Sequence, residues 1–152
     1  MVDRSMLKGL NILVVEDVDA IRALVVRIVE SLGADNVHQA MGIETALAEL
    51  DSRPFDVILL DYELSGRDGL VVIKKLREDL DHFNHETPII VLTGHSEAHI
   101  VQDCMQAGAE GYLVKPVMPD MLGQRILQVL AKHQTVAEET RPPSEVVWGS
   151  RG

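Results

Sequence analysis

Short apolar runs alternate along the chain with longer segments in which apolar residues recur every three or four positions. Three of the short runs are nearly continuous and rich in β-branched residues, at positions 10–15, 56–60 and 88–92. Runs of this kind are typical of strands that are buried on both faces, as in a parallel sheet. Two weaker strands are expected at 36–40 and 111–114.

Five helices are expected between and after these strands, because the apolar residues of each segment share one face at a spacing of about 3.6 residues. Gly33 follows the first as a C-cap, Asp68 precedes the third as an N-cap, and Pro119 suits the first turn of the fifth. The five apolar stripes are Ile21, Leu24, Val25, Ile28 and Leu32; Ile43, Leu47 and Leu50; Leu70, Ile73, Leu76 and Leu80; Ile100, Cys104 and Ala107; and Leu122, Ile126, Val129 and Leu130.

This regular alternation of strand and helix predicts an α/β fold with right-handed crossovers. We expect a doubly wound, flavodoxin-like parallel sheet of five strands in the order 2-1-3-4-5, with helices on both faces. The pattern stops near His133, so residues 1–133 are expected to form one domain and residues 134–152 a flexible C-terminal tail.

The tail contains Trp148, the only tryptophan in the chain, beside Val146 and Val147. Two interpretations stay open at this point. The segment is either a disordered end or a short apolar motif that docks on the body of the protein or on a partner.

Composition narrows the possible functions. The formal net charge is -10, from 14 basic and 24 acidic residues, which disfavours binding to nucleic acid and suits a cation or a basic partner. A single cysteine, Cys104, excludes an intrachain disulfide and a cysteine zinc cluster. No apolar run approaches the ~18 residues of a membrane span, and the N-terminus is unlike a signal peptide. A cytoplasmic protein that does not bind membranes is therefore expected.

Histidines cluster in the second half of the chain. Four histidines lie between positions 82 and 99, and we interpret them as solvated loop residues rather than a zinc site. The methionines are expected to fill gaps in the core. The residues concerned are His82, His85, His95 and His99, and Met6, Met105, Met118 and Met121.

Acidic residues follow two strands that the predicted order makes neighbours. Glu16 and Asp17 follow the first strand, and Asp61 follows the third. Each alone is explained by helix capping or by a solvated turn. Adjacent strands, however, lie only ~4.8 Å apart, so three carboxylates at this edge would repel one another unless a cation were present. Oxygen ligands suit Mg²⁺, and the chain contains no glycine-rich phosphate-binding motif.

Two further polar residues end the fourth and fifth strands. Thr93, before Gly94, offers a hydroxyl at a turn where the backbone allows close approach. Lys115, before Pro116, offers a cation, but it lies two strands and roughly 10 Å from Asp61 and must extend fully to reach it. An ordinary turn and a surface lysine explain these residues equally well when each is considered alone.

Taken together, the polar residues at the strand ends resemble those of the response regulator receiver domain of two-component signalling, in its chemotaxis-receiver-like form. The likeness covers residues 8 to about 133. The supporting motifs are Ile12-Leu13-Val14-Val15-Glu16-Asp17, Asp68-Gly69, Ala107-Gly108-Ala109 and Leu113-Val114-Lys115-Pro116.

This resemblance implies that Asp61 is the phosphoacceptor. It implies that Glu16, Asp17 and Asp61 bind Mg²⁺ with the Glu63 backbone carbonyl as a further ligand. Glu16 stands where the family often has aspartate, and Ser65 stands where it commonly has proline, so the loop 63–67 is expected to be more mobile.

The resemblance also implies a conformational switch. Thr93 resembles the switch hydroxyl, Tyr112 the switch aromatic, and Lys115 the cation that contacts the phosphoryl group. The Lys115–Pro116 bond is expected to be cis. Tyr62, directly after the acceptor, is bulky enough to shade the site, and Glu63 and His95 occupy positions at which the family tunes phosphoryl lifetime.

The implied function is that of a phosphorelay receiver and not of a turnover enzyme. A sensor histidine kinase or a histidine phosphotransfer protein would donate the phosphoryl group to Asp61. The modified domain would then bind a downstream protein, or a second copy of itself, through the fourth helix, the last strand and the fifth helix. Two alternatives remain: a Mg²⁺-dependent phosphatase with Asp61 as nucleophile and Glu63 as general acid, and a pseudo-receiver that signals without phosphorylation.

Overall fold

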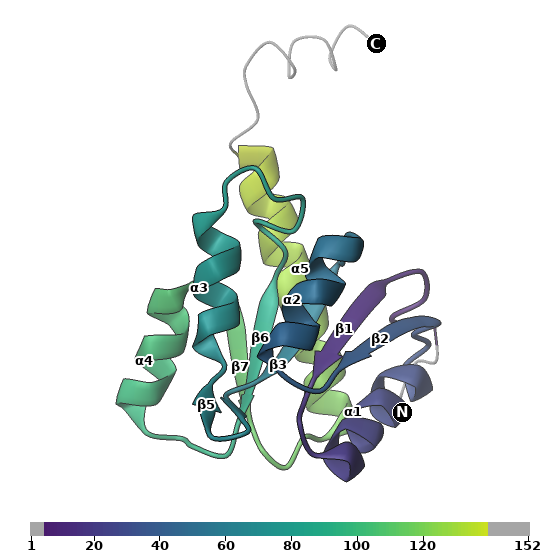
Figure 1. Cartoon of the computed structure of the whole chain (residues 1–152). Coiled ribbons are helices and arrows are strands. Elements are labelled where there is room, and N and C mark those ends of the chain that lie inside the picture. The colour runs from purple at the N-terminus through teal and green to yellow at the C-terminus, as the bar shows by residue number, and fades with distance from the viewer. Residues whose placement is uncertain (1–4, 140–152) are drawn as a thin grey trace, which may run out of the picture.

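The computed structural model describes residues 5–139, and side chains over residues 5–133 (Figure 1). Its main sheet is parallel and consists of β1 (Asn11–Val15), β2 (Asn36–Ala40), β3 (Val57–Asp61), β6 (Ile89–Thr93) and β7 (Gly111–Val114). The spatial order is β2-β1-β3-β6-β7. The predicted order 2-1-3-4-5 is therefore confirmed, since these are the five strands of the main sheet in chain order.

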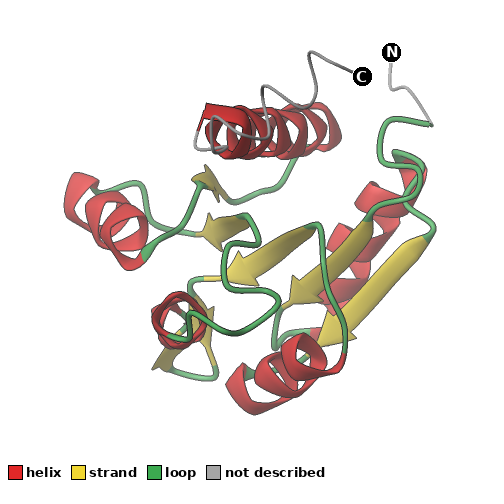
Figure 2. Ribbon diagram, turned by 90° about the horizontal axis from the view of Figure 1, so that it is seen from above, coloured by secondary structure: helices red, strands yellow, loops and turns green. Residues whose placement is uncertain are grey.

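Helices cover both faces of the sheet, as Figure 2 shows from above. On one face lie α1 (Asp19–Ser31) and α5 (Pro119–Glu139). On the other lie α2 (Ile43–Ser52), α3 (Leu70–Glu78) and α4 (Ala98–Ala107). This arrangement confirms the doubly wound α/β fold.

The sheet separates two hydrophobic clusters. Alternate residues of each central strand point to opposite faces, so Ile58 and Leu60 of β3 join the α2–α3–α4 cluster while Val57 and Leu59 join the α1–α5 cluster. All five residues of β3 are buried. Burying a side chain of this size stabilises the fold by ~1.5–3 kcal/mol, which explains why the central strands are continuously apolar.

Some apolar residues assigned to the core from sequence are exposed. Leu24 lies at the margin of the buried stripe of α1 and is 49% exposed. Leu80 is 77% exposed because α3 ends at Glu78, two residues earlier. Met105, Met118 and Met121 are also exposed, so their assignment to the core was wrong. Met6 packs against the α1–α5 cluster as expected.

Two elements differ from the sequence pattern. The segment after β3 forms a two-stranded antiparallel hairpin, β4 (Glu63–Leu64) with β5 (Arg67–Asp68). Its turn contains Ser65 and Gly66 at positive φ, 54° and 77°. At the other end of the chain α5 continues through residue 139, beyond the point where the apolar pattern weakens.

The proposed boundary between domain and tail stays a prediction, and Trp148 lies outside the described residues. Over residues 5–139 no helix combines the length and the apolar character that crossing a bilayer requires.

Candidate functional site

The polar residues at the strand ends lie together at the carboxyl edge of the sheet. Asp61 ends β3, Glu16 and Asp17 follow β1, and Lys115 follows β7. These four side chains line one cavity of about 300 Å³. The topology is the cause, because β1 and β3 are neighbours whose chains leave the sheet in opposite directions at this point.

Three carboxylates converge in this cavity. Glu16, Asp17 and Asp61 each place one oxygen within 4.8 Å of the others. Glu16 and Asp61 are only 2% and 6% exposed, so water screens their repulsion poorly. Among the described residues this is the one cluster of three or more acidic, histidine or cysteine side chains able to hold a metal ion. Its oxygen-only donors fit a hard divalent cation such as Mg²⁺.

The Lys115 side chain is long enough to reach the carboxylates, although β7 lies two strands from β3. Its Nζ donates to Glu16 Oε1 at 2.9 Å and to Asp61 Oδ1 at 3.0 Å. The backbone brings it there, since the Lys115 amide donates to the Thr93 carbonyl at 2.7 Å and continues the pairing of β6 with β7. The Lys115–Pro116 bond is cis, as the resemblance implied.

The close packing of these charges changes their ionisation. Burial, together with the hydrogen bond to Asp61, raises the pKa of Glu16 to about 7, although Lys115 opposes the shift. Burial alone would lower the pKa of Lys115, but its bonds to Glu16 and Asp61 outweigh burial and raise it. The pKa of Asp17 is lowered by hydrogen bonding to Glu16 and to Ser65. The cavity thus favours positive charge.

Thr93 ends β6, the strand next to β3, and Tyr112 lies within β7, and neither residue is among those that line the cavity. The Thr93 side chain is buried, and its Oγ1 accepts a hydrogen bond from the His95 amide at 3.0 Å. Tyr112 is half-buried against the cluster that contains α4. The switch roles of both residues stay predictions, as does the ligand role of the Glu63 carbonyl.

A second group of side chains forms one rim of the cavity. His95 Nε2 bonds to Glu63 Oε1 at 2.9 Å, and the His95 ring lies edge-on to Tyr62 with 6.0 Å between ring centroids. The bond to Glu63 raises the pKa of His95. His95 was interpreted from sequence as a solvated loop histidine, and its bond to Glu63 was not predicted. The signal that could have found its partner is position, since both residues stand two places beyond the ends of adjacent strands.

Backbone contacts hold the acidic loops in place. Arg22 donates from Nη1 to the Glu16 carbonyl at 2.8 Å, and sequence reasoning missed this residue. Ser65 donates to Asp17 Oδ2 twice, from its amide at 2.9 Å and from its hydroxyl at 3.3 Å. Gly69 packs so closely that a Cβ there would collide with the carbonyl oxygen of Asp61. The site is therefore fastened from α1, from the β4–β5 turn and from the start of α3.

The sequence model of the response regulator receiver domain family matches residues 12–134. The chain belongs to this family. Among curated receiver proteins it is 28% identical to the chemotaxis protein CheY-3 of Vibrio cholerae over 127 residues, covering 82% of this chain and 95% of the relative. It is 28% identical to the chemotaxis protein CheY of Pseudomonas aeruginosa, covering 81% and 98%. It also matches the sensory/regulatory protein RpfC of Xanthomonas campestris at 28% identity, with 95% of this chain but 19% of that protein covered.

Solved receiver structures have the same fold. The CheY-like receiver domain protein from Methanospirillum hungatei superposes with a TM-score of 0.73 at 26% identity and covers 84% of this chain and 98% of its own. A response regulator from Chloroflexus aurantiacus gives 0.75 at 28% identity, with 82% and 99% covered. This chain is therefore a receiver domain of two-component signalling, and its acidic cluster lies where the fold places a ligand.

Proposed function

We propose that this receiver accepts a phosphoryl group on Asp61 from the phosphohistidine of a sensor histidine kinase or a histidine phosphotransfer protein. One observation carries the proposal. Asp61 lies at the carboxyl end of β3, with the Lys115 ammonium 3.0 Å from its Oδ1 and the carboxylates of Glu16 and Asp17 beside it. A nucleophile, a fixed cation and a set of oxygen ligands thus occupy one cavity.

The chemistry follows from these positions. A carboxylate oxygen of Asp61 attacks phosphorus in line with the histidine nitrogen, so the O–P bond forms while the P–N bond breaks and the imidazole leaves. Lys115 offsets the negative charge that gathers on the phosphoryl oxygens. Glu16, Asp17, Asp61 and the Glu63 carbonyl would hold Mg²⁺, which would supply further positive charge at this site. Water later hydrolyses the aspartyl phosphate.

The phosphorylated state would differ in shape. The Thr93 hydroxyl would turn toward a phosphoryl oxygen, and Tyr112 would move into the space released beside α4. The face made by α4, β7 and α5 would then bind a downstream protein or a second copy of the chain. A charge added at one point thus selects between two arrangements of one surface. We place this signalling in the cytoplasm and assign the chain no substrate turnover of its own.

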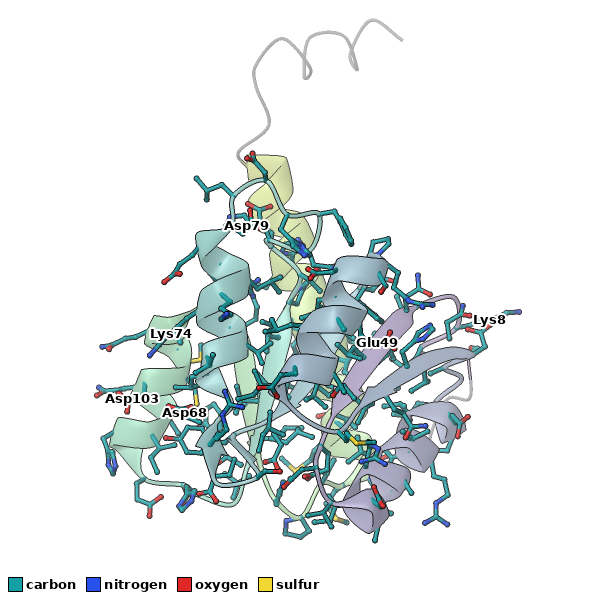
Figure 3. The ribbon with its side chains drawn as sticks, viewed as in Figure 1. Lys8, Glu49, Asp68, Lys74, Asp79 and Asp103 are labelled. Atoms are coloured by element: carbon teal, nitrogen blue, oxygen red, sulfur yellow. The ribbon has the colours of Figure 1, made fainter. Side chains whose placement is uncertain are left out.

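Intact mass spectrometry after incubation with acetyl phosphate and Mg²⁺ tests the proposal. The wild-type protein should gain the mass of one phosphoryl group, and Asp61→Asn should gain none. Asp103→Asn, an exposed carboxylate on α4 that Figure 3 labels, is the matched control and should be modified like wild type. Modification of Asp61→Asn at the wild-type rate would reject the acceptor.

Two further measurements separate the alternatives. A pseudo-receiver would stay unmodified and would not bind beryllofluoride with Mg²⁺. A phosphatase would release phosphate over many turnovers from a phosphate ester, and Glu63→Gln would slow that release. We do not expect phosphatase turnover, because the Glu63 carboxylate is engaged by His95 at 2.9 Å.

A further inference from the structure

The loop between α3 and β6, residues 79–88, presents two large apolar side chains to solvent. Leu80 is 77% exposed and Phe83 is 57% exposed. The loop lies at the amino end of the sheet, the end opposite the carboxylate cavity. Its ten residues exceed the median of ~4–6 for such connections.

Asn84 holds the backbone of this loop firmly. Its side chain is fully buried and accepts a hydrogen bond from the Phe55 amide at 2.9 Å. It donates to the carbonyls of Leu50 at 2.9 Å and Arg53 at 2.8 Å. The Thr87 hydroxyl donates to it at 2.9 Å. The loop is therefore fixed to the segment that joins α2 to β3.

Arg77 fixes the second half of the loop. Its guanidinium donates to the carbonyls of His85 at 2.7 Å and Thr87 at 2.8 Å, and also to the Gly108 carbonyl at 3.1 Å. Because three carbonyls from two loops share one half-buried cation, neither loop moves without breaking charge-assisted hydrogen bonds.

His82 positions Phe83 itself. The His82 ring bonds to Asp51 Oδ1 at 2.8 Å through Nε2 and accepts the Asn84 amide at 2.9 Å through Nδ1. The Phe83 ring lies against it, with 4.7 Å between centroids. Half-buried and bonded, His82 is not the solvated residue that we predicted. Leu80 and Phe83 thus project from a pre-organised surface, which lowers the entropic cost of binding a partner.

The surface around Leu80 and Phe83 is acidic. The loop contains the exposed acidic residues Asp79, Asp81 and Glu86, and the last residue of α3 is Glu78, which is also exposed. Figure 3 shows Asp79 at this end of the molecule. An occupant of this surface should therefore combine apolar side chains with positive charge.

The chain itself contains a segment of this composition. Val146-Val147-Trp148 lies between Arg141 and Arg151, with Glu145 directly before it, so residues 141–151 carry two basic side chains and one acidic one. This segment follows α5, and α5 ends at the same end of the molecule as the α3–β6 loop (Figure 1). The nine residues from position 139 to position 148 span up to ~30 Å when extended. A folded chain of this size has a radius of gyration of roughly 14 Å, so the segment can reach the loop.

We propose that Val146-Val147-Trp148 docks on the surface formed by Leu80 and Phe83 of the same chain. The Trp148 ring would cover the two exposed side chains, and Arg141 and Arg151 would face the acidic residues around them. Docking would tie the end of α5 to the α3–β6 loop. The proposal is independent of the chemistry at Asp61, since it concerns the opposite end of the sheet.

Fluorescence of the full chain tests the docking directly, because Trp148 is its only tryptophan. When tryptophan is excited selectively, Trp148 should emit at a shorter wavelength in the folded chain than in the urea-unfolded chain. This difference should not depend on protein concentration. Leu80→Ser/Phe83→Ser should move the emission to that of the unfolded chain and raise quenching by acrylamide several-fold. The control Leu24→Ser/Met41→Ser, which changes two exposed apolar residues elsewhere, should leave the emission unchanged.

Three results would overturn the proposal. The first is a wild-type emission equal to that of the unfolded chain. The second is a blue-shifted emission that the double variant does not alter. The third is a blue shift that grows with protein concentration, which would indicate docking on a second copy of the chain. If circular dichroism shows that the double variant is unfolded, NMR of Trp148→Ser decides instead. Docking predicts that the amide shifts of residues 79–86 change in that variant, and unchanged shifts would contradict it.

Discussion

Glu16 illustrates how the site alters the chemistry of a single side chain. Its carboxyl is 2% exposed and shares the cavity with Asp61, so its pKa rises to about 7. In the unfolded chain the same group has the ordinary glutamate pKa of 4.5. Between these two pH values the folded protein holds a proton that the unfolded chain has released, which links folding to pH.

The free energy of unfolding of the metal-free protein should therefore change with pH through Glu16. The contribution of Glu16 to that free energy is fully present below pH 4.5 and is lost as pH rises through about 7. Urea unfolding in EDTA over this range should show a decline in wild type that is reduced in Glu16→Gln. Glu30→Gln, on the exposed surface of α1, should keep the wild-type decline. Parallel profiles for wild type and Glu16→Gln would contradict the assignment.

Gly69 gives a second prediction for one residue. A Cβ at this position would collide with the Asp61 carbonyl oxygen and lie 3.1 Å from that of Tyr62. Gly69→Ala should lower the free energy of unfolding by ~1–3 kcal/mol, as overpacking does, and should slow phosphorylation because the backbone of Asp61 must shift. Gly42→Ala, where the Cβ would meet nothing within 4 Å, is the control in urea unfolding. Equal stability of the two variants would show that the contact relaxes freely.

The sequence predicted which residues end the strands but not which partners they take. Glu16, Asp17 and Asp61 could be placed together because strand order alone brings them to one edge. The bonds of Ser65 to Asp17 and of His95 to Glu63 depend on how two loops turn after leaving the sheet. Loop paths of this kind carry no periodic signal in the sequence.

Among the elements, the strands were predicted best. β1, β3 and β6 are buried on both faces, and this burial produces the continuous apolar runs that identified them. The end of α3 was predicted less well, because Leu80 continues the apolar spacing although the helix has already ended. The β4–β5 hairpin was missed because its strands are two residues each, too short to show alternation.

The α3–β6 loop provides a prediction about one element. Asn84 forms four hydrogen bonds from a fully buried position, three of them to residues between 29 and 34 positions away in the chain. Asn84→Ala should lower the free energy of unfolding by at least ~1–3 kcal/mol, the cost of one buried group left unpaired. Asn36→Ala, on the exposed side of β2, should change it little in the same urea titration. A loss no larger than that of the control would show that the loop is held by other contacts.

At the scale of the whole molecule, excess negative charge coincides with a site for positive charge. The chain has a net charge of -10, and three carboxylates meet in one cavity. The alternating elements predicted the topology of the whole domain, since right-handed crossovers leave few arrangements of five strands. Which apolar side chains are exposed could not be predicted in the same way, because the sequence does not distinguish an exposed methionine from a buried one.

A divalent cation that binds the folded state alone should stabilise the molecule. Millimolar MgCl₂ should raise the midpoint of thermal unfolding above the value in NaCl of equal ionic strength, because Mg²⁺ relieves the repulsion among Glu16, Asp17 and Asp61. The salt control accounts for general screening of the net charge. Asp17→Asn should lose most of the increment specific to Mg²⁺. An increment retained in full by that variant would place the ion elsewhere.

The two hydrogen bonds from Ser65 to Asp17 Oδ2 link the β4–β5 turn to the candidate ion site. One oxygen of this carboxylate holds the turn, and the same side chain belongs to the acidic cluster that could hold a cation. A metal ion coordinated by both oxygens of Asp17 would weaken the hydrogen bonds from Ser65. Metal binding and the conformation of the turn are therefore coupled through Asp17 Oδ2. A change in the backbone signals of Ser65 and Gly66 would then report metal occupancy without any probe attached to the protein.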